Sequence, residues 1–256
     1  MRLKFLQVNI FRGKFLGSLL DFIEKVDPDI ITMQEVSCGE INLYEDKKAD
    51  LFELIKGKTG YDGVFHSDTS LSGSPFSRFG NGVFSKWPIN SSAVVPLATY
   101  GSLTLDEFNN NKGDVWARLS RHMLDAEIEI EGKAVHAISI HGRRIAPPLD
   151  DPENIRQAHV MANHLKSFGD KPFIVGGDFN MPPGTEVIKI VSSVASNLMA
   201  DCGVKQTLNP QEHELGEKGY LVDFIFTSKH FKKISLEVPQ VTVSDHLPVV
   251  AELEML

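Results

Sequence analysis

Phe173-Ile-Val-Gly-Gly-Asp-Phe-Asn180 is an apolar run that ends on a carboxylate and an amide. Strand interiors favour Val, Ile and Phe, whereas ionisable groups are costly to bury, so the run predicts a buried strand ending at Asp178. Side chains two apart on an extended chain point the same way, which aims Asp178 and Asn180 at one target. The two glycines let the backbone pass close to a neighbouring segment. A capped strand-to-loop turn would use the same residues, because Asp and Asn both favour turns.

An apolar strand closed by a residue that can hold a metal or move a proton occurs six times in the chain. The closing residues are Asn9, Glu35, His141, Asp178, Asp223 and the pair Asp245-His246. A single polar residue at a strand end marks only the exit of the chain into water. Six such ends predict strands that deliver their tips to one shared site.

Size and composition favour one globular domain over residues 1–256. A chain of this length can bury roughly 75% of its unfolded surface, so one large core is feasible without disulfides. Its 42% hydrophobic and 23% charged residues are ordinary for a globular protein. The six strand ends span the whole length, which argues against division into two domains.

Cysteine usage and charge indicate the cellular setting. Cys38 and Cys202 fit no metal-ligand spacing, and the apolar start of the chain is too short for a signal peptide. We expect a reduced, cytoplasmic protein with no stable membrane insertion, and no protein partner is inferred. The net charge of -8 argues against a broad grip on duplex DNA. It leaves a phosphate substrate possible, since a bound divalent cation reverses the local field.

Apolar spacing predicts the order of helices and strands. Strands end at Asn9 and Glu35, and helices cover about 15–26, 51–55, 152–168 and 185–194. Further strands are predicted near 63–66, 82–85, 92–97, 115–123, 126–130, 133–141, 172–178, 221–227, 233–238 and 247–254, with a hairpin at Gly132. The pattern predicts an α+β sandwich, two packed mixed β-sheets flanked by helices. Three loops are expected to shape the pocket, namely 67–78, 101–114 and 142–152.

Two carboxylates in the last third indicate acid–base or ligand chemistry. Asp245 and His246 are adjacent, so one can ligate a cation while the other contacts a phosphate oxygen or moves a proton. A turn capped by Asp245 before the last strand is the alternative. Asp223 is flanked by strand formers, and a buried carboxylate there needs a partner such as a histidine.

An all-oxygen ligand set points to the metal. The set consists of Asn9, Glu35, Asp178 and Asp245. Such ligands suit Mg2+ or Mn2+ and are poor for zinc, which prefers His and Cys. Taken alone, Glu35 also fits a solvated strand end and His141 a loop histidine. Taken together, the residues indicate phosphoester hydrolysis, which needs a cation, an activated water and a donor for the accumulating charge.

In this order along the chain, the residues resemble the signature of the endonuclease/exonuclease/phosphatase superfamily, which includes DNase I-like and exonuclease III-like enzymes. The matching motifs are Asn9, Gln34-Glu35, His141, Gly177-Asp-Phe-Asn180, Asp223 and Ser244-Asp-His246. The stretch 80–89, which contains Asn81, is similar to the family's G-x-x-x-L-S-R-x-P-I segment. The resemblance runs from residue 3 to about 253 and implies a DNase I-like four-layer architecture.

The resemblance also implies a role for each residue around the metal and the water. Glu35 would be the main Mg2+ ligand, helped by Asn9 and Asp245, and Mn2+ would substitute. Asp178 would orient or deprotonate the attacking water. Asn180 would position that water or the phosphate.

A second group would contact the substrate. His246, paired with Asp223, and His141 would contact the scissile phosphate. Arg143, Arg144 and Asn81 are candidate substrate-binding residues, although exposed arginines are often only solvated.

The motifs specify the superfamily better than the substrate. The repair nucleases carry N-G-x-R and E-T-K, whereas this chain reads Asn9-Ile-Phe-Arg12 and Glu35-Val-Ser37, which argues against abasic-site repair. A nucleic acid or a nucleotide is the favoured substrate. A phosphoinositide, phospholipid or other small phosphoester is the alternative. A non-catalytic binding module on the same scaffold is a third possibility.

Overall fold

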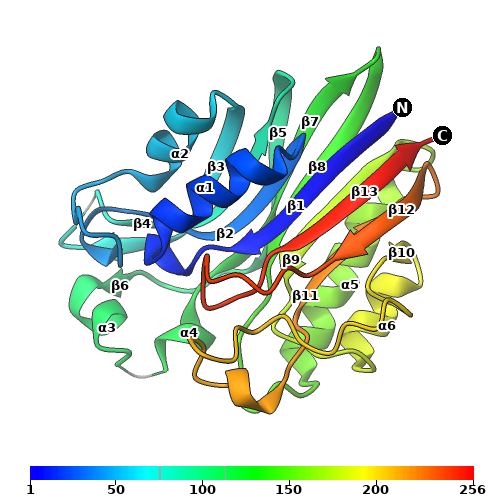
Figure 1. Ribbon diagram of the computed structural model, residues 1–256. Helices are drawn as coiled ribbons and strands as arrows, with labels where there is room; N and C mark the ends of the chain where they lie inside the picture. Colours follow the sequence, from blue (N-terminus) through cyan, green and yellow to red (C-terminus); the bar gives the residue numbers. More distant parts are fainter. Residues whose placement is uncertain (75, 113) are drawn as a thin grey trace.

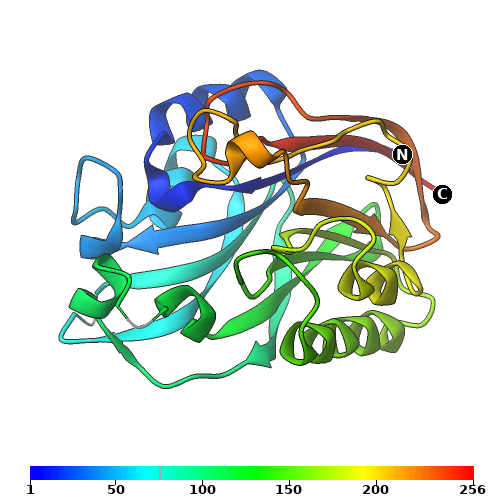
Figure 2. The same cartoon turned by 90° about the horizontal axis from the view of Figure 1, so that it is seen from below.

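The apolar runs of the sequence form two mixed β-sheets that pack face to face. The computed structural model describes residues 1–74, 76–112 and 114–256. Helices cover the outer face of each sheet, which gives four stacked layers (Figure 1, Figure 2). The predicted α+β sandwich of two mixed sheets flanked by helices is confirmed.

The first sheet joins the two ends of the chain, because the N-terminal strand lies between its parallel neighbour β2 and the antiparallel C-terminal strand β13 (Figure 1). Its strands, in spatial order, are β12 (Phe231–Glu237), β13 (Val249–Met255), β1 (Arg2–Asn9), β2 (Ile30–Cys38), β4 (Arg78–Ser85), β3 (Asp62–Ser72) and β6 (Leu103–Thr104). Helices α1 (Leu16–Val26) and α2 (Leu51–Thr59) cover its outer face. Their buried side chains, such as Leu19 and Ile55, pack against Leu6 and Ile31.

The second sheet carries the hairpin predicted at Gly132, where Ile130 pairs with Lys133. Its strands, in spatial order, are β10 (Ser196–Asn197), β11 (Asp223–Thr227), β9 (Phe173–Asp178), β8 (Lys133–His141), β7 (Arg121–Ile130) and β5 (Ile89–Ala98). Helices α5 (Pro152–Ser167) and α6 (Glu186–Ser192) cover its outer face. The Asp151 carboxylate caps α5 by accepting from the Asn154 N–H, and Asp150 accepts from the first amides of α6 instead.

Gly176 and Gly177 allow close backbone approach in the second sheet. A Cβ on Gly176 would lie 2.2 Å from Thr32 Oγ1 of the first sheet, and one on Gly177 would lie 2.5 Å from the Ile140 carbonyl oxygen. Only glycine fits both places, because real side chains do not come this close to other atoms. The two sheets therefore come together closely just beneath Asp178.

Strand register aligns the polar residues near the strand ends, although the prediction that strands close on Asp223 and on Asp245-His246 is wrong: Asp223 begins β11, and the pair lies in the segment before β13. Across the second sheet, His141 is the Cα partner of Asp178, and Asp178 is the partner of Asp223. In the first sheet, Asn9 pairs with Gln34, the residue before Glu35. Pairing aligns the polar ends within each sheet, and the packing of the two sheets brings the two sets together, as the contact of Asn9 with Asp178 shows.

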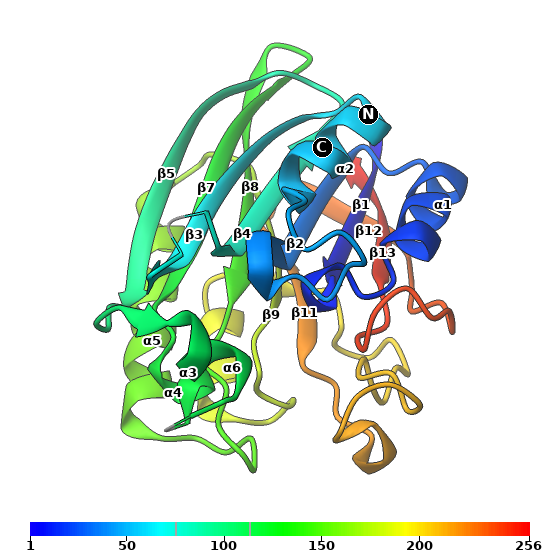
Figure 3. The same cartoon turned by 90° about the vertical axis from the view of Figure 1, so that its left-hand side faces the viewer.

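The region 101–123 differs from the prediction. The strand predicted over 115–123 is wrong at its start: Val115–Arg118 forms the short helix α4, and β7 runs without a break from Arg121 through the predicted gap at 124–125. The predicted loop 101–114 contains β6 and helix α3 (Leu105–Asn109), which begins with a capping box formed by Thr104 and Glu107. Helices α3 and α4 lie together at one end of the molecule (Figure 3), where Phe108, Val115 and Leu119 form a small separate core. Positions 75 and 113 of the predicted loops lie outside the described residues.

Candidate active site

Atom Oδ2 of Asp178 is the point on which four predicted site residues converge. Asn9 Nδ2 lies 3.2 Å from it and Asn180 Nδ2 3.4 Å. His141 Nε2 and His246 Nε2 lie 3.6 Å and 3.7 Å away, from opposite sides of the sheet edge. The other oxygen, Oδ1, accepts the backbone N–H of Asn180 at 2.9 Å. The carboxylate is therefore fixed in place and faces both imidazoles.

Glu35 reaches this site through an irregularity in β2 rather than from a strand end. The prediction that the strand closes at Glu35 is wrong, since β2 continues to Cys38. The pairing of β2 with β4 shifts between Met33 and Val36, and Glu35 adopts a φ of 58°. Left-handed backbone is uncommon for a non-glycine residue and is typical of functional sites. The bulge breaks the alternation of the strand and turns Glu35 toward the sheet edge.

Asn9 links the two acidic residues. Its Nδ2 is 3.4 Å from Glu35 Oε1 as well as 3.2 Å from Asp178 Oδ2. Its Oδ1 accepts the backbone N–H of Phe11 at 3.1 Å, which fixes the orientation of the amide. In this orientation Asn9 presents its nitrogen to the carboxylates. To act as the predicted metal ligand, its carbonyl oxygen would also have to face the ion.

His246 is held by a buried carboxylate. Its Nδ1 lies 2.8 Å from Asp223 Oδ2, and both side chains are almost fully buried. Asp223 is itself fixed by the Thr207 hydroxyl, which accepts the Asp223 N–H, and by the Gln7 amide at 3.4 Å. Burial alone would lower the pKa of His246, but the carboxylates of Asp223 and Asp178 outweigh it and raise that pKa well above its ordinary value. These two carboxylates therefore favour the protonated imidazole.

His141 has the opposite environment. Its Nδ1 lies 3.1 Å from Nη1 of Arg121, whose side chain is completely buried. Burial and the positive charge of Arg121 hold the pKa of His141 well below its ordinary value. A guanidinium can only donate, so Nδ1 must accept and the proton of the neutral ring must be on Nε2. His141 therefore presents a neutral N–H group toward Asp178.

Carboxyl groups crowd the site without enough positive charge to balance them. Burial raises the pKa of Asp178 to about 6, opposed by His246 and increased further by Asp223. Burial also raises the pKa of Asp245 to about 7, opposed by His246 and increased by Glu35. Glu35 Oε2 is buried and has no hydrogen-bond partner in the described part of the chain. These features fit a divalent cation with oxygen ligands, for which Glu35 and Asp245 are the available carboxylates.

The site residues surround a cavity of about 50 Å³. Eight of its lining residues are polar, namely Asn9, Glu35, His141, Asp178, Asn180, His213, Asp245 and His246. Phe11, Trp116 and Arg144 complete the lining. A cavity of this volume holds little more than one small polar group, so the remainder of a larger substrate would lie against the mouth.

The mouth combines aromatic rings with guanidinium groups. The Cζ atoms of Arg12 and Arg144 lie 5.9 Å and 5.8 Å from the centre of the Trp116 ring. Phe11 and Arg12 are held at φ values of 47° and 50°, which places two consecutive left-handed residues beside the cavity. We call Phe11, Arg12, Trp116 and Arg144 the aromatic rim.

Only one of the three predicted substrate-binding residues lines the cavity. Arg144 does so, although its Nη2 is paired with Glu214. Arg143 Nη1 instead lies 2.5 Å from Asp151 Oδ2, so this arginine is joined to the residue that caps α5. Asn81 is completely buried and donates to the His122 carbonyl oxygen, away from the lining. A sequence pattern cannot distinguish an arginine in the pocket from one that stabilises a helix end.

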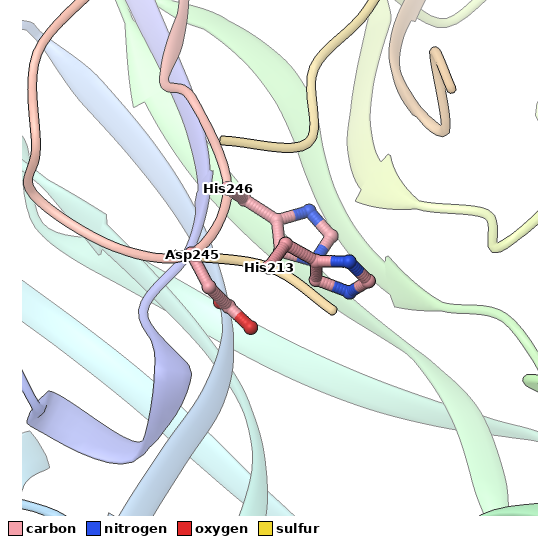
Figure 4. Close-up of side chains that lie close together, drawn as sticks. All are labelled: His213, Asp245 and His246. Carbon is pink, nitrogen blue, oxygen red and sulfur yellow. The ribbon is translucent and has the colours of Figure 1, made fainter. Parts of the chain in front are cut away.

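Besides Phe11 and Arg12 of the aromatic rim, Trp116, Arg121 and His213 were not predicted as site residues. Trp116 was assigned to a strand, Arg121 has no motif of its own, and His213 lies in a loop without a pattern. His213 is brought next to Asp245 and His246, with one potential ligand atom of each within 4.8 Å of the others (Figure 4). The rings of His213 and His246 meet edge to face, at 5.4 Å between centroids. No signal in the sequence places this loop over the site.

The fold and the site together are those of a phosphoester hydrolase. In this two-sheet sandwich, carboxylates, asparagines and two histidines with different protonation preferences come together at one edge. The model of the endonuclease/exonuclease/phosphatase family matches residues 6–246, so the chain belongs to this family and its resemblance to it is confirmed. No sequence among the curated proteins matches the chain.

Solved structures of the same fold cover nearly the whole chain. An endonuclease/exonuclease/phosphatase from Bacteroides vulgatus is 19% identical, with 100% of each chain covered and a TM-score of 0.76. A mannosyl-6-phosphatase from Bacteroides thetaiotaomicron is 18% identical over 99% of this chain and 100% of its own, with a TM-score of 0.73. TDP2 from Danio rerio in complex with a single-strand DNA product is 12% identical over 99% of both chains, with a TM-score of 0.71. At these identities the likeness shows the fold alone.

None of the described helices is both long and apolar enough to cross a bilayer.

Proposed function

We propose that the protein is a Mg2+-dependent hydrolase that cleaves a phosphodiester or phosphomonoester bond by attack of an activated water. The observation that carries the proposal is the convergence on Asp178 of two asparagines and two histidines, beside a Glu35 carboxylate with an unpartnered oxygen. Glu35 and Asp245, with Asn9 beside them, would hold the cation. When bound, Mg2+ supplies positive charge next to the phosphate oxygens, and Mn2+ would substitute for it.

The protein groups divide the remaining work. Asp178 accepts the proton of the attacking water, and Asn180 holds the carboxylate and positions the water. His246, kept cationic by Asp223, donates to a phosphate oxygen and stabilises the charge that accumulates there. His141 donates to the same phosphate from Nε2 as a neutral group. His246 thus provides a positive charge to the phosphate, and His141 provides a neutral hydrogen-bond donor.

A nucleic acid or a nucleotide is the favoured substrate. The small cavity suits the phosphate, and the aromatic rim offers Phe11 and Trp116 for stacking with a base outside it. Arg12 and Arg144 add positive charge beside the Trp116 ring. The fold shared with TDP2 in complex with a DNA product supports the same substrate class.

A small phosphomonoester is the second candidate. A cavity of about 50 Å³ accepts a terminal phosphate as readily as an internal one. The fold shared with a mannosyl-6-phosphatase supports this alternative. It requires no base at the aromatic rim, which is the difference that an assay can detect.

A substrate panel with Mg2+ or Mn2+ tests the proposal. The panel contains single-stranded DNA, duplex DNA, RNA, mononucleotides, a sugar phosphate, a phosphoinositide and bis-p-nitrophenyl phosphate. We expect metal-dependent turnover of nucleic acid or nucleotide, abolished by EDTA and reduced by about 10²- to 10⁴-fold in Asp178→Asn. Inactivity across the panel, or full activity of Asp178→Asn at saturating metal, would contradict the proposal. Preference for the sugar phosphate would favour the second candidate.

A further inference from the structure

A segment that is held by ion pairs contributes one residue, His213, to the lining of the cavity. The segment 209–216 is anchored at its start by the Asn209 N–H, which donates to the Asp245 carbonyl oxygen at 2.8 Å. Two ion pairs hold its middle in place: Glu212 to Lys14 at 3.0 Å, and Glu214 to Arg144. It lies near α4 at the lower end of the molecule (Figure 1). The residue between the two anchoring glutamates is His213.

Local hydrogen bonding fixes the protonation of the His213 ring. Its Nδ1 lies 3.0 Å from the backbone nitrogen of Leu215, whose N–H can only donate. The Nδ1 lone pair is thereby used, so the neutral ring carries its proton on Nε2. Among the described residues, Nε2 has no hydrogen-bond partner, and the ring lines the cavity beside His246.

This arrangement distinguishes between two roles for His213. A metal ligand needs a free lone pair, but Nδ1 is occupied by the Leu215 N–H and Nε2 carries the proton. A bound anion needs a donor, which Nε2–H supplies. The cluster with Asp245 and His246 therefore suits an anion held next to the cation better than a third ligand of the cation (Figure 4).

We propose that His213 is a substrate-binding residue, which donates from Nε2 to a non-bridging phosphate oxygen in the cavity, beside Asp245 and His246. The inference rests on the proposed function and adds a residue to it. The substrate phosphate is then held by three imidazoles, of which His246 is cationic and His141 and His213 are neutral. The two ion pairs of the segment keep His213 in position before substrate arrives, which limits the ordering cost of binding.

Binding of inorganic phosphate to the Mn2+-saturated protein tests the inference without turnover. Isothermal titration calorimetry compares the wild type with His213→Ala and His213→Gln, and with His159→Gln as a control on the exposed face of α5. We expect the phosphate Kd to rise about tenfold or more in His213→Ala, because a hydrogen bond to a charged group is lost. His213→Gln, which retains a donor near the Nε2 position, should recover part of the affinity. His159→Gln should match the wild type.

Two further readouts complete the test. The Mn2+ affinity of His213→Ala should equal that of the wild type, and the ¹⁵N spectrum of His213 should show the Nε2–H form. An unchanged phosphate Kd in His213→Ala, or equal phosphate Kd values for His213→Gln and His213→Leu, would overturn the inference. Metal-dependent activity of the wild type would in that case still uphold the proposed function. Weakened Mn2+ binding would also overturn it, in favour of a ligand role. A wild type that neither binds phosphate nor hydrolyses any phosphoester would overturn both.

Discussion

Arg121 and His141 form a buried pair in which the guanidinium carries the positive charge and the imidazole is neutral. The Nη1 to Nδ1 distance is 3.1 Å, and the arginine side chain has no exposed surface. The pair is the electrostatic inverse of His246 with Asp223, where a carboxylate makes the imidazole a cation. The two histidines beside Asp178 are thus driven toward different charge states, His141 by burial together with Arg121 and His246 by Asp223 together with Asp178.

Replacing Arg121 tests its buried ion pair with Asp68 through the stability of the fold. Arg121 lies 3.7 Å from the buried Asp68 carboxylate, so Arg121→Met removes the permanent positive charge beside it and leaves His122 as its remaining partner. Breaking a buried ion pair from one side costs about 3–5 kcal/mol, which urea unfolding would measure. Adding Asp68→Asn to Arg121→Met should restore part of the loss. A double variant less stable than Arg121→Met by the full cost of Asp68→Asn alone would show that the two residues act independently.

Removing the carboxylate behind His246 should shift the pH dependence of turnover. Asp223 raises the pKa of His246, so the wild-type imidazole stays protonated, and active, to high pH. In Asp223→Asn that pKa falls toward its ordinary value, and kcat/KM should decline from a lower pH as the ring loses its proton. The profile of kcat/KM against pH measures the shift. An alkaline limb at the same pH in both proteins would contradict the charge state assigned to His246.

The ion pair of Arg144 with Glu214 should compete with substrate. Arg144 lines the cavity, and its guanidinium is shared between Glu214 and the Trp116 ring. Relative to Glu212→Gln, which loosens the His213 segment in the same way, Glu214→Gln should free the guanidinium for an anionic substrate and lower KM by about two- to fivefold, the range expected for an exposed pair. Glu212→Gln, which releases Lys14 outside the lining, is the matched control. Equal effects of the two substitutions would mean that only the anchoring of the segment matters.

The buried carboxylate of Asp125, outside the active site, should control the stability of the fold in acid. Asp125 Oδ1 lies 2.9 Å from His136 Nδ1, and its Oδ2 lies 3.1 Å from His164 Nε2 of α5. Burial opposes ionisation, but the two histidines outweigh it and lower the pKa of Asp125. The stabilisation is therefore complete above the unfolded value of about 3.9 and is lost as pH falls through the lower folded pKa.

Unfolding experiments with Asp125→Asn check that dependence. The free energy of unfolding should fall by about 1–3 kcal/mol at pH 7, the cost of leaving buried partners unsatisfied. The difference from the wild type should shrink below about pH 4, where the wild-type carboxylate also takes up a proton. Asp170→Asn, in an exposed pair with Lys229, should change stability little at either pH. A difference that stays constant between pH 7 and pH 3 would contradict the ionic role of Asp125.

The sequence was sufficient for the parts of the site that depend on strand pairing. Apolar runs identify β8, β9 and β11, and their register alone brings His141, Asp178 and Asp223 side by side. The sequence pattern also predicts Glu35 as a site residue, and Glu35 lies in the cavity lining, but the bulge that turns it toward Asp178 has no signature in the sequence. Tertiary packing overrides the local pattern there.

The residues that were missed depend on partners far away in the chain. Arg121 is buried because Asp68 of β3 lies beside it, and neither residue alone predicts the pair. His213 is placed by ion pairs from Lys14 and Arg144 to its two glutamate neighbours. Arg143 was expected at the substrate, but Asp151 holds it at the start of α5. Side-chain partners across distant loops are decided by the fold, and a single sequence does not reveal them.

Titration of Mn2+ into the wild type and Glu35→Gln tests most directly whether these groups surround one divalent cation. Removing the charge of a ligand should weaken Mn2+ binding by at least about tenfold, since even residues that only support a ligand have effects of that size. Glu40→Gln, an exposed glutamate outside the cavity lining, should bind Mn2+ as the wild type does. Equal Mn2+ affinity of Glu35→Gln and the wild type would contradict the account, because the unpartnered Glu35 oxygen would then have no cation to hold.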